Sequence, residues 1–259
     1  MEKISQFIIL TLFVCLVSPL FAVIPPNLNA APVSASTDTS EHVILLHGVL
    51  KSGFSMKRLQ TALEQEGYHA FNWDYDARNF TVQENAAKLD SLIRAKDFVR
   101  RRIHFIAHSI GALVVRHYFE EYPQNNPGRI VMIAPPNQGS RLATELRDFP
   151  PFRWFYKKSI ANLLTGADAF APNAGIPDTE FGIIAGGTGG EHGFTWYLPG
   201  DDDSVLSVEQ TRLRGAADFI VLPHVHGTIV IQDDTILQSL YFIEHGRFLH
   251  QEVNRADML

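Results

Sequence analysis

The sequence predicts an α/β fold, in which a mostly parallel β-sheet is flanked by helices. Short apolar runs alternate with segments of helical periodicity from Glu41 onward, and this alternation is typical of parallel sheets with helical crossovers. Several of the apolar runs end in a loop of small residues, as buried parallel strands do. The chain has 259 residues, so the part after its N-terminal leader suits a single domain with a sizeable core.

The first half of the chain contains three predicted strands and two predicted helices. The run from Val43 to His47 is almost entirely apolar and indicates a buried strand. A helix near Ser55 to Glu66 and a strand from Tyr68 to Trp73 follow it. A second helix, from about Thr81 to Phe98, precedes a strand that begins at Ile103.

The second half repeats this alternation. The predicted elements are a helix from Gly111 to Tyr122, a strand from Ile130 to Ala134, helical pieces between Arg141 and Leu164, and strands near Gly182 and Phe219. A last helix starts around Asp233-Asp234-Thr235, with capping residues in place, and ends before Gly246.

The segment Ile103-His104-Phe105-Ile106-Ala107-His108-Ser109-Ile110-Gly111 has the layout of a nucleophile elbow. A short apolar strand runs into a serine flanked by small residues, and a helix follows. Such a turn lifts the serine hydroxyl out of the sheet and points it at a substrate. Ala107 and Gly111 have to be small because the helix backbone crosses close to the neighbouring strands there. Ala107 stands where the pattern usually has glycine.

The run Leu46-His47-Gly48 at the end of the first predicted strand supplies the context for this serine. In hydrolases with an elbow, the loop after that strand donates a backbone N–H to the oxyanion that forms when serine attacks a carbonyl. The residue after the serine donates the second N–H. Val49 and Ile110 are therefore the expected oxyanion-hole donors.

Acid and base candidates follow in the chain order of serine, then acid, then histidine. Three consecutive aspartates, Asp201-Asp202-Asp203, come after the strand near Gly182, and His224 and His226 come after the strand near Phe219. An imidazole has to take the proton of a serine hydroxyl, and a buried carboxylate holds that imidazole in the right tautomer. Two other interpretations of the aspartate run are a solvated turn and a calcium site. The run lacks the alternating ligand spacing of a calcium loop, which argues against the calcium site.

Together these motifs resemble those of the α/β-hydrolase superfamily, in particular bacterial serine hydrolases of the lipase and esterase type. That group includes small single-domain lipases and the relatives of the GPI inositol-deacylase and thioesterase families. The segment Ile133-Ala134-Pro135-Pro136-Asn137-Gln138-Gly139-Ser140 is similar to the turn beside the serine in lipases. The resemblance spans most of the chain from Glu41 onward, and it implies a single-domain α/β-hydrolase with its catalytic groups at the carboxyl ends of the strands.

The resemblance also selects the acid and the base. The segment from Asp203 to Glu209 is similar to the Asp-Gly-x-Val-x-Val-Glu segment whose aspartate is the triad acid, with Ser204 in the place of glycine. It implies Asp203 as the acid, with Asp202 as the alternative. His226 is implied as the base because the family's histidine follows Leu-Pro-x-x and precedes the final helix. The expected catalytic triad is Ser109, His226 and Asp203.

A short helical insertion covers the active site in this fold, between the strand after the elbow and the acid strand. Here that insertion contains the aromatic run Phe149-Pro150-Pro151-Phe152-Arg153-Trp154-Phe155-Tyr156. It indicates either a cap for an apolar acyl substrate or an ordinary amphipathic helix packed on the sheet. The residues that we expect to contribute to substrate binding are His47, His108, Trp154 and Trp196.

The N-terminus indicates export. Residues 1–31 are predicted to be a signal peptide or an N-terminal anchor, residues 32–40 a linker, and residues 41–259 the α/β-hydrolase domain. The sequence is compatible with cleavage after Ala22 or after Ala30. An uncleaved leader would associate with a membrane through residues 7–24. We therefore expect a periplasmic or secreted protein, or a membrane-anchored one. Cys15 is the only cysteine, so the exported domain cannot form an internal disulfide.

Composition and chemistry together define the expected activity. A net charge of −6 and the lack of a basic stripe with interleaved aromatic residues argue against a nucleic-acid partner. The sequence predicts a monomeric serine hydrolase of carboxylic esters, with a small-molecule or lipid substrate and no metal or organic cofactor. The same triad suits a thioesterase or an acyltransferase, and the alternative from another class is a non-catalytic binding protein on the hydrolase fold.

Overall fold

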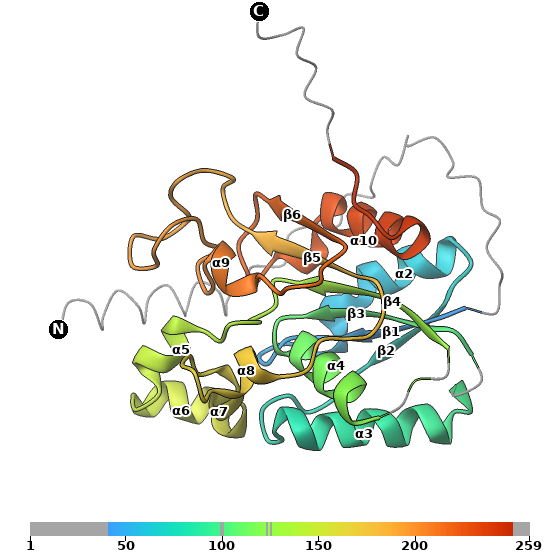
Figure 1. Cartoon of the computed structure of the whole chain (residues 1–259), viewed down its shortest axis with the longest axis horizontal. Helices are drawn as coiled ribbons and strands as arrows, with labels where there is room; N and C mark the ends of the chain where they lie inside the picture. Colours follow the sequence, from blue (N-terminus) through green and yellow to red (C-terminus); the bar gives the residue numbers. More distant parts are fainter. Residues whose placement is uncertain (1–40, 99–100, 123, 125, 251–259) are drawn as a thin grey trace, which may run out of the picture. The chain divides into compact units, whose positions relative to one another are not determined.

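Six parallel strands form a single sheet at the centre of the fold (Figure 1). They are β1 (His42–Leu46), β2 (His69–Trp73), β3 (Ile103–His108), β4 (Pro127–Ile133), β5 (Phe181–Gly186) and β6 (Asp218–Leu222). Their order across the sheet is β2-β1-β3-β4-β5-β6, and every neighbouring pair is parallel. The predicted fold class is therefore confirmed.

The computed structural model describes residues 41–98, 101–122, 124 and 126–250. The predicted leader (1–31) and linker (32–40) lie outside the described residues, as does the end of the predicted domain from residue 251 onward. Within the described ranges, no helix combines the length and the apolar character that a membrane span requires.

Burial of the strands follows their position in the sheet. Every residue of β3 and β5 is buried, because helices cover both faces of the central strands. The edge strand β2 has no buried residue, and β6 has only Leu222. The almost continuous apolar runs of the sequence therefore mark the central strands, where both faces meet a helix.

Two pairs of long helices cover the sheet, one pair on each face (Figure 1). Helices α2 (Lys57–Gln65) and α10 (Asp233–His245) lie on one face, and α3 (Val82–Ala95) and α4 (Ile110–Glu121) lie on the other. This is the layered arrangement that the alternation of strands and helices predicts.

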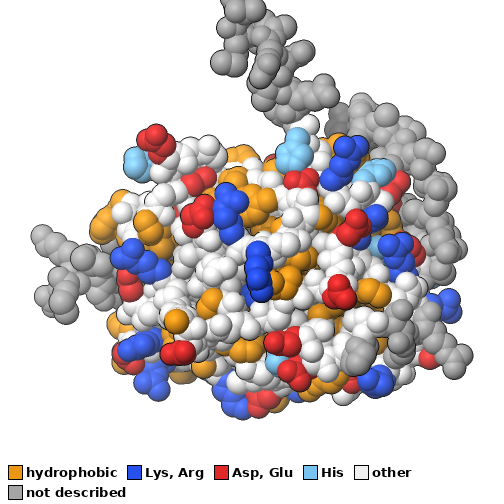
Figure 2. Space-filling view, viewed as in Figure 1, with side chains coloured by type: hydrophobic (Ala, Val, Ile, Leu, Met, Phe, Trp, Pro, Cys, Tyr) orange, Lys and Arg blue, Asp and Glu red, His pale blue; other side chains and the backbone are white. Residues whose placement is uncertain are grey.

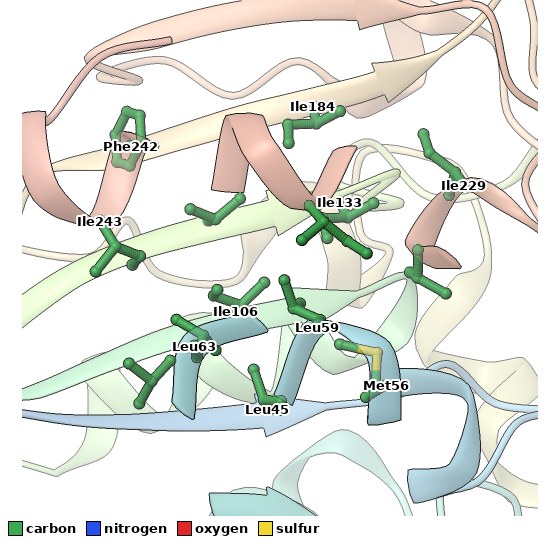
Figure 3. Close-up of a cluster of buried hydrophobic side chains, with 14 of the residues drawn as sticks. Leu45, Met56, Leu59, Leu63, Ile106, Ile133, Ile184, Ile229, Phe242 and Ile243 are labelled. Atoms are coloured by element: carbon green, nitrogen blue, oxygen red, sulfur yellow. The ribbon is translucent and has the colours of Figure 1, made fainter. Parts of the chain in front are cut away.

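A hydrophobic core lies between the sheet and the helices α2 and α10 (Figure 3). Leu59 and Leu63 of α2 and Phe242 of α10 point into this layer and are almost completely buried. They meet inward side chains of the central strands such as Ile106 and Ile184. Burial of side chains of this size contributes roughly 1.5–3 kcal/mol each, so this layer holds the sheet in place beneath the loops that follow its strands.

The ends of the helices agree with their local sequence signals in α3 and differ in α10. Thr81 caps α3 with a full capping box, in which its side chain accepts from the Glu84 N–H and the Glu84 carboxylate accepts from the Thr81 N–H. The expectation of a capping side chain at the start of α10 is wrong. Its N-cap residue is Gln232, whose side chain makes no cap hydrogen bond. Gly246 ends α10 in the left-handed conformation, with φ 72°.

The predicted helical insertion lies between β4 and β5. Its elements are α5 (Arg141–Leu146), α6 (Pro150–Tyr156), the 3-10 turn η3 (Lys157–Ser159), α7 (Ile160–Leu163) and α8 (Phe170–Asn173). These helices lie together at the end of the sheet where the strands finish (Figure 1). The Ser140 N–H donates to the Leu163 carbonyl at 2.7 Å, which ties the insertion to the loop that leaves β4.

Three further short elements follow strands of the sheet. They are the 3-10 turn η1 (Gly53–Met56) after β1, the helix α9 (Val208–Thr211) after β5 and the 3-10 turn η4 (Ile229–Ile231) after β6. In parallel sheets the loops after the strands meet at one edge, so the segments that lead to η1, α9 and η4 converge where the elbow serine lies.

Some predicted boundaries moved by a few residues. Strand β1 ends at Leu46, so His47 belongs to the loop. Strand β4 begins at Pro127, earlier than the expected Ile130, because proline at the first position of a strand needs no N–H for the ladder. Helix α3 ends at Ala95 before Asp97, whose φ of 54° is left-handed.

The surface carries both acidic and basic side chains (Figure 2). On the face that Figure 2 shows, acidic and basic side chains are interspersed with apolar side chains. Several large apolar side chains are exposed, and the most exposed of them are Phe54, Trp196 and Trp154.

Candidate active site

Ser109 lies at the sharp turn between β3 and α4. Its φ of 55° and ψ of −126° are strained for a residue with a side chain, and they are the conformation that an elbow requires. The Ser109 N–H donates to the Ile133 carbonyl of β4 at 2.9 Å, which anchors the turn to the sheet. The serine is 8% exposed, so the strained turn places it at the border between core and solvent.

The small residues around the serine allow close packing. A Cβ on Gly111 would lie 3.0 Å from the Leu46 carbonyl oxygen, so α4 crosses directly over the end of β1. Ala107 is completely buried and lies in β3 between Leu46 of β1 and Met132 of β4. The alanine methyl group fits at this position, where the family pattern usually has glycine.

His226 bridges the serine and a carboxylate. Its Nε2 lies 3.0 Å from the Ser109 Oγ, and its Nδ1 lies 2.7 Å from the Asp203 Oδ2. The His226 N–H also donates to the Asp203 carbonyl at 2.8 Å. The structure thus brings the expected Ser109, His226 and Asp203 into one hydrogen-bonded chain, although 117 residues separate the serine from the histidine.

The Asp203 carboxylate is fully buried and is oriented by backbone donors. Its Oδ1 accepts from the Leu206 N–H at 2.7 Å and from the Val205 N–H at 2.9 Å. These bonds occupy one oxygen and leave the other for His226. A carboxylate held in this way fixes the ring of the histidine and the tautomer that it adopts.

The neighbouring aspartates have other partners. The Asp202 carboxylate accepts from the Ser204 N–H at 2.7 Å and from both donors of Thr195 at 3.1 Å, and burial raises the pKa of this carboxyl. The Asp201 carboxylate accepts from the backbone of Thr188 and Gly189. The three carboxylates therefore diverge, and Asp203 is the one that faces His226.

His224 lies on the same loop as His226 but has a different partner. Its Nε2 lies 2.7 and 2.8 Å from the two carboxylate oxygens of Asp234 at the start of α10. Asp234 is the second residue of α10, inside the helix rather than at its N-cap, and its Oδ1 also accepts from the Thr235 N–H at 2.7 Å. The pair of His224 and Asp234 ties the loop after β6 to α10.

The predicted oxyanion donors belong to the two loops that flank the serine. Ile110 is the first residue of α4, so its N–H has no acceptor within the helix. Val49 follows Gly48, and a Cβ on that glycine would lie 3.2 Å from the Ser109 Cβ. The loop after β1 therefore passes directly against Ser109. In the part of the chain that the structure describes, neither N–H has a protein acceptor.

His47 and Tyr75 support this loop. The His47 ring is 1% exposed, its Nδ1 donates to the Gly48 carbonyl at 2.8 Å, and burial lowers its pKa. The Tyr75 ring packs against the His47 ring in a tilted arrangement, with the centroids 4.6 Å apart, and its hydroxyl donates to the His47 carbonyl at 2.8 Å. Sequence reasoning missed Tyr75, and its only signal was its place just after the strand that ends at Trp73.

His108 is buried beside Ser109 and His226. It is 1% exposed, and its Nε2 lies 3.1 Å from the His226 carbonyl oxygen. Burial, with a smaller effect of His226, holds the pKa of His108 well below its ordinary value. His47 and His108 thus lie beside the candidate triad, and their role in substrate binding stays a prediction.

The two tryptophans expected at the substrate site are exposed. Trp154 lies on α6, where it contacts Phe155 edge to face and Arg78 lies over its ring. Trp196 precedes the aspartate run and contacts the edge of Tyr197, whose hydroxyl donates to the Ser204 carbonyl. Among the described residues, neither indole contacts Ser109 through a hydrogen bond or a ring contact, so their role also stays a prediction.

One group of side chains could gather around a metal ion. Among the described residues it consists of His117, Glu120 and Glu121 of α4. His117 Nδ1 lies 3.1 Å from Glu120 Oε2, which also accepts from the Gly175 N–H. The pair has a structural partner in the insertion, and it belongs to a different part of α4 from the serine.

Solved structures of lipases and esterases share the fold. The mature lipase BlEst2 of Bacillus licheniformis is 19% identical, with a TM-score of 0.62 over 83% of this chain and 96% of the lipase. The metagenomic carboxyl esterase MGS0156 is 15% identical, with a TM-score of 0.58 over 86% of this chain and 82% of the esterase. A thermophilic esterase from Thermogutta terrifontis is 14% identical, with a TM-score of 0.51 over 76% of this chain and 87% of that one.

Sequence comparison adds a family. No curated protein matches the chain. The model of the family described as Domain of unknown function (DUF7379) matches residues 25–176, which is more than half of the chain. The match includes the elbow serine and both expected oxyanion donors, and it ends before Asp203 and His226. The chain therefore belongs to the DUF7379 family, and it has the α/β-hydrolase fold of lipases and esterases.

Proposed function

We propose that this protein is a serine hydrolase that cleaves carboxylic esters of apolar acyl groups. The observation that carries the proposal is the hydrogen-bonded chain from Ser109 through His226 to Asp203, which starts at a strained elbow. The arrangement matches what nucleophilic catalysis by serine needs: a hydroxyl, a base within hydrogen-bond reach and a buried carboxylate that orients the base. The lipase and esterase folds of similar structures support the same reaction class.

The proposed reaction has two steps. The Ser109 Oγ attacks the ester carbonyl while His226 Nε2 takes its proton, and the N–H groups of Val49 and Ile110 bind the oxyanion. His226 then gives the proton to the departing alkoxide, which leaves an acyl group on the serine. A water molecule, deprotonated by His226, attacks this acyl enzyme. The bond between the acyl carbon and Ser109 Oγ then breaks, His226 returns the proton to that oxygen, and the carboxylic acid leaves. Asp203 orients the imidazole and stabilises its charged form throughout.

An apolar substrate is proposed because of the residues around the carboxyl end of the sheet. The insertion between β4 and β5 carries Trp154, and the loop before the acid carries Phe194 and Trp196, all of them exposed. Exposed aromatic side chains at this end of the fold provide apolar surface for an acyl chain. The preferred chain length is the quantity that the first experiment measures.

The first experiment compares ester hydrolysis by the wild-type protein with hydrolysis by Ser109→Ala. p-Nitrophenyl esters from acetate to palmitate give the chain-length profile, and a fluorophosphonate probe reports covalent labelling of the serine. We expect Ser109→Ala to lose turnover and labelling. The matched control is Ser91→Ala, which removes an exposed hydroxyl of α3 and is expected to keep both.

The acid is tested in the same assay with two neighbouring carboxylates. Asp203→Asn is expected to lower kcat by on the order of 10³–10⁴-fold, because the wrong tautomer of the base is stabilised. Asp202→Asn removes a buried carboxylate that binds the backbone of its own loop, so its larger effect should be on thermal stability. An inert wild type that also fails to label would contradict the catalytic assignment. Faster turnover of thioesters than of matched esters would favour the alternative function of a thioesterase.

A further inference from the structure

His108 links the two halves of the candidate site. It is the last residue of β3 and directly precedes the nucleophile, and its ring reaches the main chain of the base. The His108 Nε2 lies 3.1 Å from the His226 carbonyl oxygen. A carbonyl oxygen only accepts, so the Nε2 carries the hydrogen and donates it.

The other ring nitrogen settles the charge of His108. A Cβ on Gly48 would lie 2.9 Å from the His108 Nδ1, so this nitrogen lies against the backbone of the oxyanion loop. Within the described residues it is buried and has no hydrogen-bond partner. A proton on Nδ1 would have no acceptor, whereas the unprotonated nitrogen leaves only a lone pair unused. The geometry therefore selects the neutral ring with its hydrogen on Nε2.

The main chain of His226 is held at two points. Its N–H donates to the Asp203 carbonyl at 2.8 Å, and its carbonyl accepts from His108 at 3.1 Å. The other contacts of this loop, from His224 to Asp234 and from the His226 ring to Asp203, do not fix the peptide group that follows His226. A shift of that peptide group on loss of the second bond would change the 3.0 Å separation of His226 Nε2 and Ser109 Oγ, on which proton transfer depends.

We propose that His108 is a positioning residue, which holds the backbone of His226 so that its Nε2 faces the nucleophile. This inference rests on the proposed function, since it assigns His226 as the base. The positioning role also requires a neutral His108 ring. The centroids of the two imidazoles are 4.9 Å apart, so a charged His108 would oppose the positive charge that His226 acquires during the reaction.

The experiment compares His108→Gln with His108→Asn. The amide nitrogen of glutamine can occupy the place of Nε2 and donate to the His226 carbonyl, whereas the shorter asparagine cannot reach it. We expect His108→Asn to lower kcat about tenfold with little change in KM, as the loss of about 1.4 kcal/mol of transition-state stabilisation predicts. His108→Gln should restore kcat to within about threefold of the wild type.

Two kinetic outcomes would overturn the proposal. Equal, wild-type-like kcat in both variants would mean that the bond to His226 is not needed. Equal loss in both variants, together with equal loss of thermal stability, would mean that His108 acts only through packing.

A second measurement separates this proposal from the proposed function. Nitrogen-15 NMR of histidine in the full chain, without substrate, should show His108 as the neutral Nε2–H tautomer. The His226 signals should shift in His108→Asn and stay close to the wild type in His108→Gln. The protein could show this NMR pattern and yet neither hydrolyse esters nor react with fluorophosphonate. That result would support the contact between His108 and His226 and reject the proposed hydrolase function. A proton on the Nδ1 of His108 would reject the positioning role.

Discussion

Ser204 illustrates at the residue scale how the structure uses strained positions. The family segment that it resembles has glycine there, and Ser204 has a φ of 79°, in the region that favours glycine. The bend lets the Asp202 carboxylate accept from the Ser204 N–H while the next carboxylate turns to Val205 and Leu206. The backbone of this loop is therefore built for a glycine, although a serine occupies it.

Ser204→Gly tests this strain. We expect the variant to be as stable as the wild type or more stable by up to about 1 kcal/mol, because relief of the left-handed conformation offsets the greater entropy of the unfolded chain. The control is Ser159→Gly, at a buried serine that donates to the Tyr156 carbonyl in the right-handed region; it should lose about 1 kcal/mol. Urea denaturation measures both. Equal destabilisation by the two changes would contradict the argument.

At the scale of elements, one buried cation joins helix α4 to the insertion. Arg116 of α4 is completely buried. Its guanidinium donates to the carbonyls of Gly175, Asn137, Ala171 and Ala174 and to the side-chain oxygen of Asn137. Burial lowers its pKa to about 10, and the carbonyl oxygens take the place of water around the charge.

The network continues to α9, which follows the loop that carries Asp203. The Asn137 side chain donates to the Thr211 carbonyl at 2.8 Å, at the end of the short α9 that follows the aspartates. Arg116 and Asn137 therefore connect four segments by hydrogen bonds. These segments are α4, the turn after β4, the insertion and the end of α9.

Arg116→Met keeps most of the side-chain volume and removes every donor. We expect a loss of about 3–5 kcal/mol, because several buried carbonyls lose their partners. Arg94→Met, which breaks an exposed pair with Asp90 on α3, should change stability by less than about 0.5 kcal/mol. Thermal and urea unfolding measure the difference. A loss in Arg116→Met no greater than that in Arg94→Met would show that the network is not needed for stability.

For the whole molecule, buried neutral histidines link folding to pH. His104 is completely buried, with its Nε2 3.0 Å from the Glu41 carboxylate and its Nδ1 accepting from the Arg129 N–H. Burial lowers the pKa of His104 to about 4, although Glu41 acts in the opposite direction. Burial lowers the pKa of His108 as well. Both rings are neutral in the folded protein at a pH where the unfolded chain binds protons.

The stability of the folded state should therefore fall as the pH drops below about 6.5, the pKa of an unfolded histidine. For His104 the loss continues to the folded pKa near 4, at up to about 1.4 kcal/mol per pH unit. In His104→Asn, the side-chain oxygen can accept from the Arg129 N–H without titrating. Urea unfolding between pH 7 and 5 should show a smaller slope for this variant. An unchanged slope would mean that His104 does not titrate on unfolding.

Local sequence pattern predicted most of the fold. The order of strands and helices, the parallel sheet and the insertion all agree with the prediction, because apolar periodicity reports burial on one or two faces directly. Boundaries were less accurate where a single residue decides them, as Pro127 does for β4 and Asp97 for the end of α3. The missing cap of α10 has a different cause, since the helix begins at Asp233 and Gln232, which makes no cap hydrogen bond, occupies the N-cap position.

The sequence by itself determined the strand, serine and helix of the elbow, because these depend on neighbours along the chain and on side-chain size. It could not separate Asp202 from Asp203, or His224 from His226, without the resemblance to a known family, because adjacent residues of the same type have the same local chemistry. The tertiary structure decides between them: His226 faces Ser109 and Asp203 faces His226, since backbone donors from Thr195 and Leu206 turn the carboxylates apart. Tyr75, Arg116 and the bond from His108 to His226 depend on contacts between distant segments, which no local pattern records.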